Sequence, residues 1–551
     1  MTGEAPRGPA HGTPLNEPVL TYAPSSAERA SVDAEIARQA REPIRVPLSI
    51  GGEQVVTDAQ QPFFAPHQHS LKLGEMSLAE PQHVARAIDA ALAQKTSWAA
   101  RSLADRAAVF RRAGDLVSGP WRARLLAATM LNQSKTVHQA EIDAACELAD
   151  FFRFNAHFAE GIAEQPLISS ATEHNSFELR PLDGFVYAVT PFNFTAIAGN
   201  LPSAPALLGN TVVWKPSPLA ALSAHHVLAV LEAAGLPPGV INVVQGDPAA
   251  ISLQVLEHSA FSGLHYTGSS AVFQSLWRAV GERITRHRSY PRLVGETGGK
   301  DFILAHPSAD VTALAVAIVR GGFEYQGQKC SAASRVFLPR SLAATVEAEV
   351  VRMVSEIRVG DPSDSQNFMG AVIGRAAFTR ISAYLEQARL DPACRLVCGG
   401  DFDDAVGYFV APTLIEVAEP DHALMREEIF GPVVSSFVYA DDRFEQILTV
   451  IDEATPYALT GAIFARDPEA IALSSSRLRM AAGNFYINDK PTGAVVGQQP
   501  FGGARLSGTN DKAGSPWNLM RWASPRVIKE NLNPPRDFRY PFLSPSRTSS
   551  S

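Results

Sequence analysis

One cysteine in this chain has neighbours that suit covalent chemistry. Cys330 lies in the segment Glu324–Ser331, EYQGQKCS, beside Lys329 and after a glycine-containing turn. A thiol reacts as the thiolate, and a free cysteine has a pKa of about 8.5. A nearby cation, backbone N–H groups and a following helix N-terminus would each favour the charged form. Taken alone, the cysteine fits a buried structural thiol better, so the case for a nucleophile depends on other segments.

Two further polar residues stand at the ends of predicted strands and could complete such a site. Glu296 opens the turn Glu296–Lys300, ETGGK, where the glycines would let a carboxylate swing and act as a general base on water. Asn193 lies in Pro191–Phe194, PFNF, and its amide could donate to an oxyanion. Losing one such donor typically raises the barrier by roughly 3 kcal/mol. The structural alternatives are a capping glutamate and a turn asparagine.

The sequence lacks the G-x-G-x-x-G fingerprint of common dinucleotide sites. Gly268–Val272, GSSAV, instead follows a predicted strand and opens a helix, where backbone N–H groups suit a pyrophosphate. Lys215 ends another predicted strand and could reach a ribose hydroxyl or a phosphate. The alternatives are a glycine-serine turn that binds nothing and a solvated lysine.

The elements that must position these residues form two α/β regions. Helices are predicted over 26–42 and through most of 80–160, and short strands over 44–66. From Thr190 onward strands at 211–215, 240–244 and 264–266 alternate with helices such as 219–234. This alternation predicts a doubly wound parallel sheet with its ligand at the carboxyl ends of the strands. A second α/β region runs from 300 to 480, with elements predicted at 309–321, 334–338, 342–357 and 374–388. The low-complexity end, 544–551, is predicted to be disordered.

Composition excludes several classes of protein. The 551 residues are 46% hydrophobic and 19% charged, with a net charge of −8 and no Lys/Arg run that would suit nucleic acid. Four cysteines are too few for a disulfide framework, which indicates a reducing compartment. Cys394 and Cys398 lack the second pair or histidines of a zinc site, so we predict no metal. No apolar run is long enough to span a bilayer. The first residues lack the apolar region of a secretory signal, and they support a mitochondrial presequence poorly without excluding one. We predict a cytoplasmic protein.

The combined motifs resemble the aldehyde dehydrogenase superfamily along nearly the whole chain. Asn193, Glu296 and Cys330 match in order and spacing, as do Glu427–Pro432, EEIFGP, and Pro500–Gly503, PFGG. The resemblance implies an α/β fold with a Rossmann-type NAD-binding domain, an α/β catalytic domain and a small β hairpin for oligomerisation. The implied ranges are 1–163 and 184–297 for NAD binding, 298–483 for catalysis, 164–183 and 515–545 for oligomerisation, and 546–551 for a disordered tail.

The resemblance also assigns roles. Cys330 would attack an aldehyde carbon, the Asn193 amide and the Cys330 N–H would hold the oxyanion, and Glu296 would activate water to release a carboxylate. NAD is the implied cofactor. Its implied contacts are Thr190, Pro191, Phe192, Lys215, Ser217, Gly246, Gly268, Ser269, Ser270, Ala271, Val272, Glu428 and Phe430. Many relatives have a glutamate at the position of Ser217, where it repels a 2′-phosphate, so charge alone does not exclude NADP.

Within the superfamily the chain looks most like the 1-pyrroline-5-carboxylate dehydrogenases. The similar stretches are Asn16–Leu20, Glu147 with 150–155, Pro191–Ile197, Gly327–Ala332 and Val496–Asp511. The implied substrate is L-glutamate γ-semialdehyde, oxidised in the second step of proline catabolism. Its implied contacts are Ser331, Gly493, Ala494, Phe194, Phe501, Glu147 and Lys329. The family often has serine where Ala494 stands, which removes one hydroxyl contact here. Family members are homodimers or larger. The alternatives are a dehydrogenase for another semialdehyde acid and a catalytically silent homologue.

Overall fold

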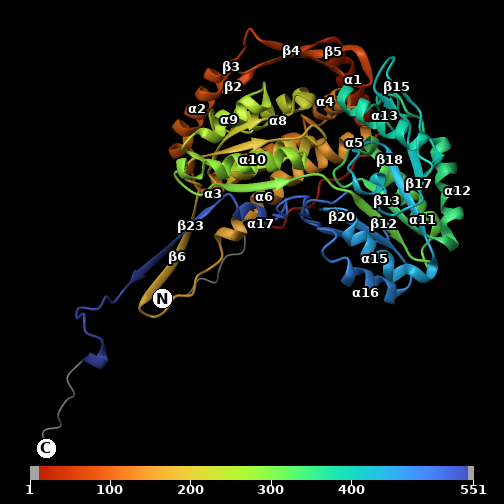
Figure 1. Cartoon of the computed structure of the whole chain (residues 1–551). Coiled ribbons are helices and arrows are strands. Elements are labelled where there is room, and N and C mark those ends of the chain that lie inside the picture. The colour runs from red at the N-terminus through yellow and green to blue at the C-terminus, as the bar shows by residue number, and fades with distance from the viewer. Residues whose placement is uncertain (1–11, 544–551) are drawn as a thin grey trace, which may run out of the picture.

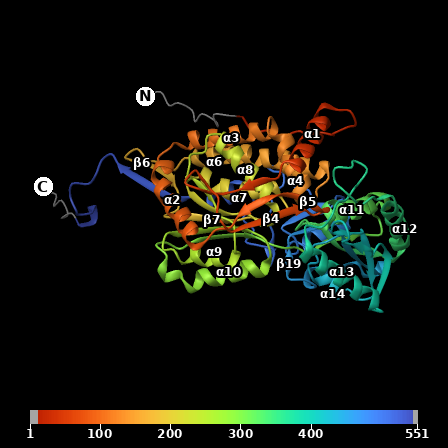
Figure 2. The same cartoon turned by 90° about the horizontal axis from the view of Figure 1, so that it is seen from above.

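A computed structural model of the chain describes residues 12–543. The start of the proline-rich lead and the tail predicted to be disordered lie outside the described residues. Two large seven-stranded sheets, each covered by helices, dominate the structure (Figures 1 and 2). Within residues 12–543, the helices are all too short or too polar to cross a membrane.

The first sheet is doubly wound around β7, the middle one of its five parallel strands. From β7 the chain builds β8 and β9 on one side and then β10 and β11 on the other, and these five strands are parallel. The carboxyl end of β7 is therefore a topological switch point, where such sheets bind ligands. The sheet order is β11 (Arg292–Glu296), β10 (Phe261–Thr267), β7 (Phe185–Val189), β8 (Thr211–Lys215), β9 (Ile241–Val243), β2 (Leu48–Ile50) and β3 (Glu53–Val55).

Crossover helices follow the strands of this sheet as predicted. The segment predicted as a helix over 219–234 is a short 3₁₀ turn followed by α8. Every residue of β8 is buried, and its run of β-branched and aromatic side chains suits a strand that is covered on both faces. The helices are α7 (Thr195–Leu207), α8 (Ala221–Ala233), α9 (Pro248–Glu257) and α10 (Ser270–Glu282).

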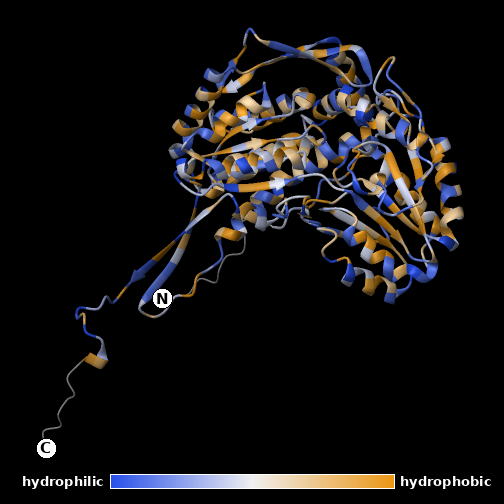
Figure 3. Ribbon diagram, viewed as in Figure 1, coloured by the Kyte–Doolittle hydropathy of each residue, from blue (hydrophilic) through white to orange (hydrophobic). Residues whose placement is uncertain are grey.

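The second sheet is also parallel, apart from one antiparallel edge strand, β14. Its order is β14 (Cys394–Cys398), β17 (Thr413–Val417), β18 (Val433–Tyr439), β13 (Ala333–Pro339), β12 (Asp301–Ala305), β20 (Thr460–Phe464) and β21 (Asn484–Ile487). Its main helices are α11 (Val311–Phe323), α12 (Arg340–Glu356), α13 (Arg375–Leu390), α15 (Phe444–Glu453) and α16 (Pro468–Arg477). Hydrophobic residues are concentrated in these strands and along the helices that cover them (Figure 3).

The N-terminal third forms a helical layer with a small three-stranded sheet. Its helices are α1 (Ala27–Arg41), α2 (Pro81–Ala99), α3 (Leu103–Ser118), α4 (Arg122–Gln133), α5 (Val137–Ala140) and α6 (Leu148–Ala163), and its strands are β1 (Ile44–Val46), β4 (Gln60–Ala65) and β5 (Gln68–Ser77). A π-helical turn over Glu141–Glu147 separates α5 from α6. The helical periodicity did not predict this turn, and π-turns are frequent at functional sites.

A two-stranded antiparallel ribbon protrudes from the body on the side away from the second sheet (Figures 1 and 2). It pairs β6 (Glu173–Arg180) with β23 (Ser524–Asn531) in register along the full length of both strands. These strands lie in the two ranges predicted for oligomerisation. The domain boundaries themselves stay a prediction.

The sequence positions of the candidate residues show how the two sheets meet. Lys215 and Glu296 are the last residues of β8 and β11, whereas Cys330 directly precedes β13. The carboxyl edge of the first sheet therefore faces the amino edge of the second. The buried hydrogen bond from Asn193 to the Gln328 carbonyl crosses this junction.

Candidate active site

The loop before Cys330 has a strained backbone that side chains hold in place. Tyr325 and Gln326 both adopt left-handed φ angles, of 51° and 56°. Such conformations cost of order 1–3 kcal/mol each and persist only where the surroundings enforce them. The buried Gln326 amide donates to the carbonyls of Ser134 and Ala371, at 3.0 and 2.7 Å, and accepts from the Gly370 N–H at 3.1 Å. These bonds fix the loop that presents the thiol.

The next residue, Gly327, brings two of the predicted motifs together. Its φ is 64°, and a Cβ at this position would lie 2.2 Å from the carbonyl oxygen of Gly431. A side chain would therefore both strain the turn and collide with the segment that carries Glu428. The nucleophile loop and the EEIFGP segment touch through backbone alone.

Asn193 is oriented by the nucleophile loop. Its side-chain Nδ2 donates to the carbonyl oxygen of Gln328 at 3.0 Å, and this bond is buried. The Gln328 side chain is fixed in turn, because its Oε1 accepts from the N–H of Ile373 at 2.9 Å. An amide nitrogen carries two N–H groups, so one remains to donate to an oxyanion. The structure thus places Asn193 beside the cysteine loop, as the sequence predicted.

Glu296 is a buried carboxyl, and few hydrogen bonds or positive charges offset the loss of its hydration. Its Oε2 accepts from the N–H of Gly503 at 3.3 Å. Burial raises the pKa of Glu296 well above its usual value, while that hydrogen bond and the Lys512 ammonium oppose the rise. The Lys512 Nζ is held by the carbonyls of Gly483 and Gly502, both at 2.8 Å. A carboxyl with a raised pKa is a stronger base once it is ionised, which suits proton abstraction from water.

The thiol environment differs from the expectation. No helix follows Cys330, because Cys330 lies in a turn that leads into β13 at Ala333. Lys329 is not available to activate the thiol either, since its Nζ pairs with Glu324 at 3.1 Å. Burial raises the pKa of Cys330 well above its usual value, and the negative charges of Asp301 and Glu296 add to the rise. In the free protein Cys330 is therefore a thiol, and the predicted stabilisation of a thiolate by Lys329 and a helix terminus is wrong.

Two neighbouring ionisable residues were not singled out by the sequence. Lys300, the last residue of the ETGGK turn, and Asp301, the first residue of β12, are both buried. Burial lowers the pKa of Lys300 to about 7 and raises the pKa of Asp301 to about 8. Asp301 still accepts a hydrogen bond from the Thr460 N–H at 2.7 Å. The junction is thus a desolvated region in which charged forms are disfavoured.

Glu428 reaches the site because glycines make room for it. A Cβ at Gly298 would lie 2.3 Å from a carboxylate oxygen of Glu428, whose Oε1 accepts from the Gly299 N–H at 3.0 Å. Burial raises the pKa of Glu428. Phe430 follows with a left-handed φ of 55°, and its ring meets Phe192 edge to face with centroids 5.9 Å apart. The structure therefore brings these predicted nicotinamide-side residues together.

The predicted adenosine-side residues lie along the carboxyl edge of the first sheet. Lys215 is only 6% exposed, and burial lowers its pKa to about 8. The alternative of a solvated lysine is therefore wrong. Ser217 caps a short 3₁₀ turn by accepting from the Leu219 N–H at 3.3 Å, and Thr190 accepts from the Trp214 indole N–H at 2.9 Å.

The GSSAV segment opens α10 as predicted. Ser269 is the N-cap of this helix, and its hydroxyl accepts from the Val272 N–H at 3.4 Å. Gly268 ends the preceding turn, and Ser270, Ala271 and Val272 form the first turn of α10. Gly246, with a φ of 146°, and Pro191 follow β9 and β7 at the same edge. A helix N-terminus with unpaired N–H groups suits an anionic ligand.

The predicted substrate residues fall into two groups. Ser331 and the loop that carries Gly493 and Ala494 are in contact, because the Ser331 hydroxyl lies 2.8 Å from the Thr492 hydroxyl. Gly493 adopts a left-handed φ of 97°. Phe501 lies further along this segment and pairs with Ala513 through an isolated bridge.

The second group surrounds the π-helical turn. Burial raises the pKa of Glu147 to about 8, Asp143 adds to the rise, and Lys135 and Lys329 oppose it. The Lys135 Nζ lies 4.1 Å from the centre of the Phe194 ring.

A buried ion pair supports the start of α7 and was missed by the sequence analysis. Lys135 Nζ lies 2.7 Å from the Asp143 carboxylate, and both side chains are almost inaccessible to solvent. Asp143 also accepts from the N–H groups of Thr195 and Ala196, at 2.9 and 2.8 Å. This carboxylate therefore fixes the helix turn directly after Asn193. The π-helical turn that presents it gave no clear signal in the periodicity.

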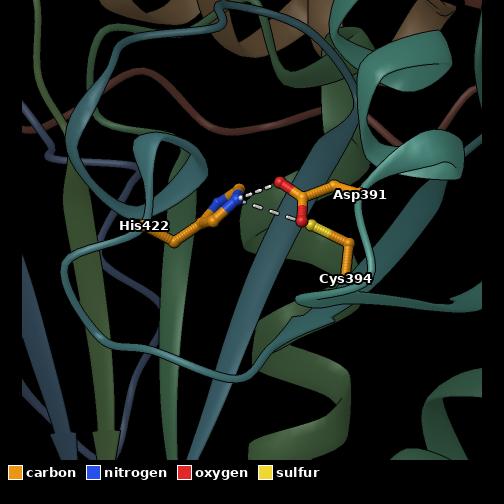
Figure 4. Close-up of side chains that lie close together, drawn as sticks. All are labelled: Asp391, Cys394 and His422. Atoms are coloured by element: carbon orange, nitrogen blue, oxygen red, sulfur yellow. Dashed lines mark hydrogen bonds and ion pairs between the residues drawn. The ribbon is translucent and has the colours of Figure 1, made fainter.

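Asp391, Cys394 and His422 gather at the edge of the second sheet (Figure 4). The sequence spacing gave Cys394 and Cys398 no histidine partner, but the fold brings one to Cys394: His422 Nε2 lies 3.7 Å from Cys394 Sγ. However, His422 Nδ1 accepts from the Leu424 N–H at 3.1 Å, so Nε2 carries the ring proton and donates to Asp391 at 3.1 Å. If a metal bound at Nε2, the ring proton would move to Nδ1, where it would face the Leu424 N–H and the hydrogen bond to Nδ1 would be lost. His422 therefore caps α14 (Ala423–Arg426), and Asp391 accepts from its other ring nitrogen.

The protonation of Cys330 leads to a prediction for its reactivity. We expect iodoacetamide to alkylate Cys330 of the free protein slowly at pH 8, with a rate still rising above pH 9, because burial and nearby carboxylates favour the neutral thiol. Mass spectrometry of the Cys330 peptide against pH measures this rate, with the more exposed Cys394 peptide as internal control. A profile that is already half-maximal below pH 8.5 would contradict the prediction.

Comparison with known proteins agrees with this geometry. The model of the aldehyde dehydrogenase family matches residues 56–528. The mitochondrial delta-1-pyrroline-5-carboxylate dehydrogenase of Mus musculus is 47% identical over 531 residues, which cover 96% of this chain and 94% of the relative. The delta-pyrroline-5-carboxylate dehydrogenase of Mycobacterium tuberculosis bound with NAD is 52% identical, with a TM-score of 0.94 over 97% of this chain and 99% of that one. The 1-pyrroline-5-carboxylate dehydrogenase from Thermus with bound NAD is 30% identical, with a TM-score of 0.88 over 95% and 100%. The chain belongs to the aldehyde dehydrogenase family.

Proposed function

We propose that this protein oxidises L-glutamate γ-semialdehyde, the open form of 1-pyrroline-5-carboxylate, to L-glutamate, with NAD as hydride acceptor. This is the second step of proline catabolism. The observation that carries the proposal is the junction of the two sheets, where Cys330, Asn193 and Glu296 meet beside the Ser331–Thr492 contact. The near full-length similarity to relatives named for this reaction supports the same substrate.

The proposed chemistry uses three side chains. The Cys330 thiol gives up its proton to solvent water as Sγ adds to the aldehyde carbon, and the resulting oxyanion accepts from the free Asn193 N–H and the Cys330 backbone N–H. Loss of hydride leaves a thioester on Cys330. Glu296 then takes a proton from water, which attacks the thioester and releases the carboxylate. The raised pKa of Glu296 fits a base of this kind.

The residues at the junction fit NAD. The buried Lys215 amine and the N-terminus of α10 suit the adenosine ribose and the pyrophosphate, and Glu428 with Phe430 suits the nicotinamide ribose. When bound, NAD supplies the hydride acceptor. We propose NAD as the preferred cofactor, in line with the NAD-bound structures of similar proteins. Because Ser217 puts no negative charge near the ribose, we expect NADP to serve as a weaker cofactor.

We propose that the substrate head group binds between Ser331 and the loop that carries Gly493 and Ala494. A short aldehyde with an amino-acid end needs donors for its α-carboxylate at a fixed distance from the thiol. Ser331 and the N–H groups near Gly493 and Ala494 would provide them, with Phe194 and Phe501 around the aliphatic middle. Alanine at 494 leaves the backbone donors in place.

A substrate panel tests this function. We expect NADH formation with pyrroline-5-carboxylate to exceed that with succinate semialdehyde or butanal by on the order of 10²-fold in kcat/KM, because buried donors left unpaired discriminate strongly. The NAD-to-NADP ratio is measured in the same absorbance assay, with Cys330→Ala as the blank. Preference for succinate semialdehyde would favour a dehydrogenase for another semialdehyde acid. Absence of turnover with every aldehyde would indicate a catalytically silent homologue.

Glu296→Gln separates the two halves of the reaction. Because the amide cannot take a proton from water, we expect a burst of NADH close to the number of active sites, followed by steady turnover slowed by about 10²–10⁴-fold. Stopped-flow absorbance measures the burst, and intact-protein mass spectrometry detects the acyl group on Cys330. A variant that lacks both burst and adduct would show that Glu296 acts before thioester formation.

We also propose that the protein is a homodimer or larger and that it is cytoplasmic. An isolated two-stranded ribbon is marginally stable in water, yet β6 and β23 extend together from the body. β23 exposes apolar side chains, and Val527 is 67% exposed. A partner subunit would cover these side chains and pair the free strand edges. The four free cysteines suit a reducing compartment, although several relatives are named as mitochondrial.

Val527→Asp tests the role of the ribbon. A charge buried at a subunit interface is costly, so we expect the molar mass from light scattering to fall towards that of a single chain. The matched control is Val406→Asp, which changes an equally apolar residue that is 61% exposed on the loop between β15 (Phe402–Asp403) and β16 (Phe409–Val410). If both variants keep the mass of the wild type, the ribbon does not hold the subunits together.

A further inference from the structure

The amide of Asn16, in the extended arm before α1, makes hydrogen bonds to two separate parts of the fold. Its Nδ2 donates to the Asp150 carboxylate on α6 and to the carbonyl of Val496, both at 2.8 Å. Its Oδ1 accepts from the Gln498 side chain, also at 2.8 Å. Both N–H groups and the carbonyl oxygen of this amide are therefore used. Asn16 joins α6 to a loop that lies 480 residues away in sequence.

That loop is the one proposed to hold the substrate head group. Val496 is buried in the core, and its carbonyl follows Gly493 and Ala494 closely in the chain. At its other end Thr492 contacts Ser331, the residue after the nucleophile. The loop is thus fixed at one end by Ser331 and at the other by Asn16.

The arm is itself firmly attached, so it can hold the loop. The Glu17 N–H donates to Asp150 at 2.8 Å, and its carboxylate pairs with Arg122 and Arg153, both at 2.7 Å. Further along the arm, the hydroxyl of Tyr22 donates to Glu141 at 2.6 Å. Glu141 belongs to the π-helical turn that also carries Asp143 and Glu147. The arm and the wall of the site therefore form one connected network.

We propose that Asn16 is a positioning residue for substrate recognition, which holds the loop at Gly493 and Ala494 so that its N–H groups meet the substrate carboxylate. This inference rests on the proposed function. Val495 is held within the loop by the Gln499 side chain, at 3.0 Å, whereas Asn16 ties the Val496 carbonyl to α6. Asn16 therefore adds a constraint from outside the loop. Without that constraint, binding the carboxylate must first order the loop, which costs conformational entropy. The cost falls on substrate binding and not on the chemistry at Cys330.

Asn16→Ala tests the proposal with substrates that do and do not carry a carboxylate. We expect KM for pyrroline-5-carboxylate to rise about ten-fold with kcat within about two-fold, the size expected for losing about one hydrogen bond to a charged group. The kcat/KM for butanal and the NAD affinity measured by fluorescence should stay within about two-fold of the wild type. Asn16→Asp, which turns a carboxylate towards Asp150 and the Val496 carbonyl, should be impaired at least as much.

The matched control is Leu15→Ala, because Leu15 is 86% exposed on the same arm. If the wild type does not favour pyrroline-5-carboxylate over butanal, the proposed function fails and this inference fails with it. If the wild type favours pyrroline-5-carboxylate but Asn16→Ala keeps its KM, the inference alone is overturned. Equal losses with both aldehydes would also overturn it, because they would show a general loosening of the fold.

Discussion

The hydrogen bond from Asn193 to the Gln328 carbonyl is the contact on which the site depends. It joins the loop after β7, at the switch point of the first sheet, to the loop before β13 in the second. Because it is buried, losing either partner would leave a polar group unsatisfied at a cost of about 1–3 kcal/mol. The same bond sets the direction of the remaining Asn193 N–H. This interaction thus ties a loop of one sheet to a loop of the other and orients the proposed oxyanion donor.

The groups around this contact show that the junction is desolvated. Burial raises the pKa values of Cys330, Glu296 and Glu428 and lowers that of Lys300. Desolvation disfavours every charged form, so the free protein holds its nucleophile neutral. The same low polarity strengthens hydrogen bonds to any charge that develops during the reaction. A site of this kind resists unwanted reactions of the thiol while remaining suited to an oxyanion.

The site also depends on support from residues distant in sequence. The Lys135–Asp143 pair fixes the start of α7 after Asn193, and Gln326 holds the strained turn before Cys330. Asn16 holds the loop proposed to bind the substrate head group. Each support uses a buried or partly buried amide or carboxylate whose hydrogen bonds are satisfied from another element. Such groups keep their positions because moving them would leave partners unpaired.

The sequence by itself determined most of the helices and strands and the family, and it predicted which residues are reactive. The β-branched run over 211–215 and the charged helix over 26–42 were readable because local periodicity reports burial directly. The grouping of Asn193, Glu296 and Cys330 followed from motif order. Only the tertiary structure decided that Lys329 is neutralised by Glu324, that a strand follows Cys330, and that His422 lies beside Cys394. The physical reason is that charge state and hydrogen-bond partners are set by the residues that surround a group in space. These partners depend on how the backbone folds, whether they come from the same loop, as Glu324 does, or from another element, as His422 does.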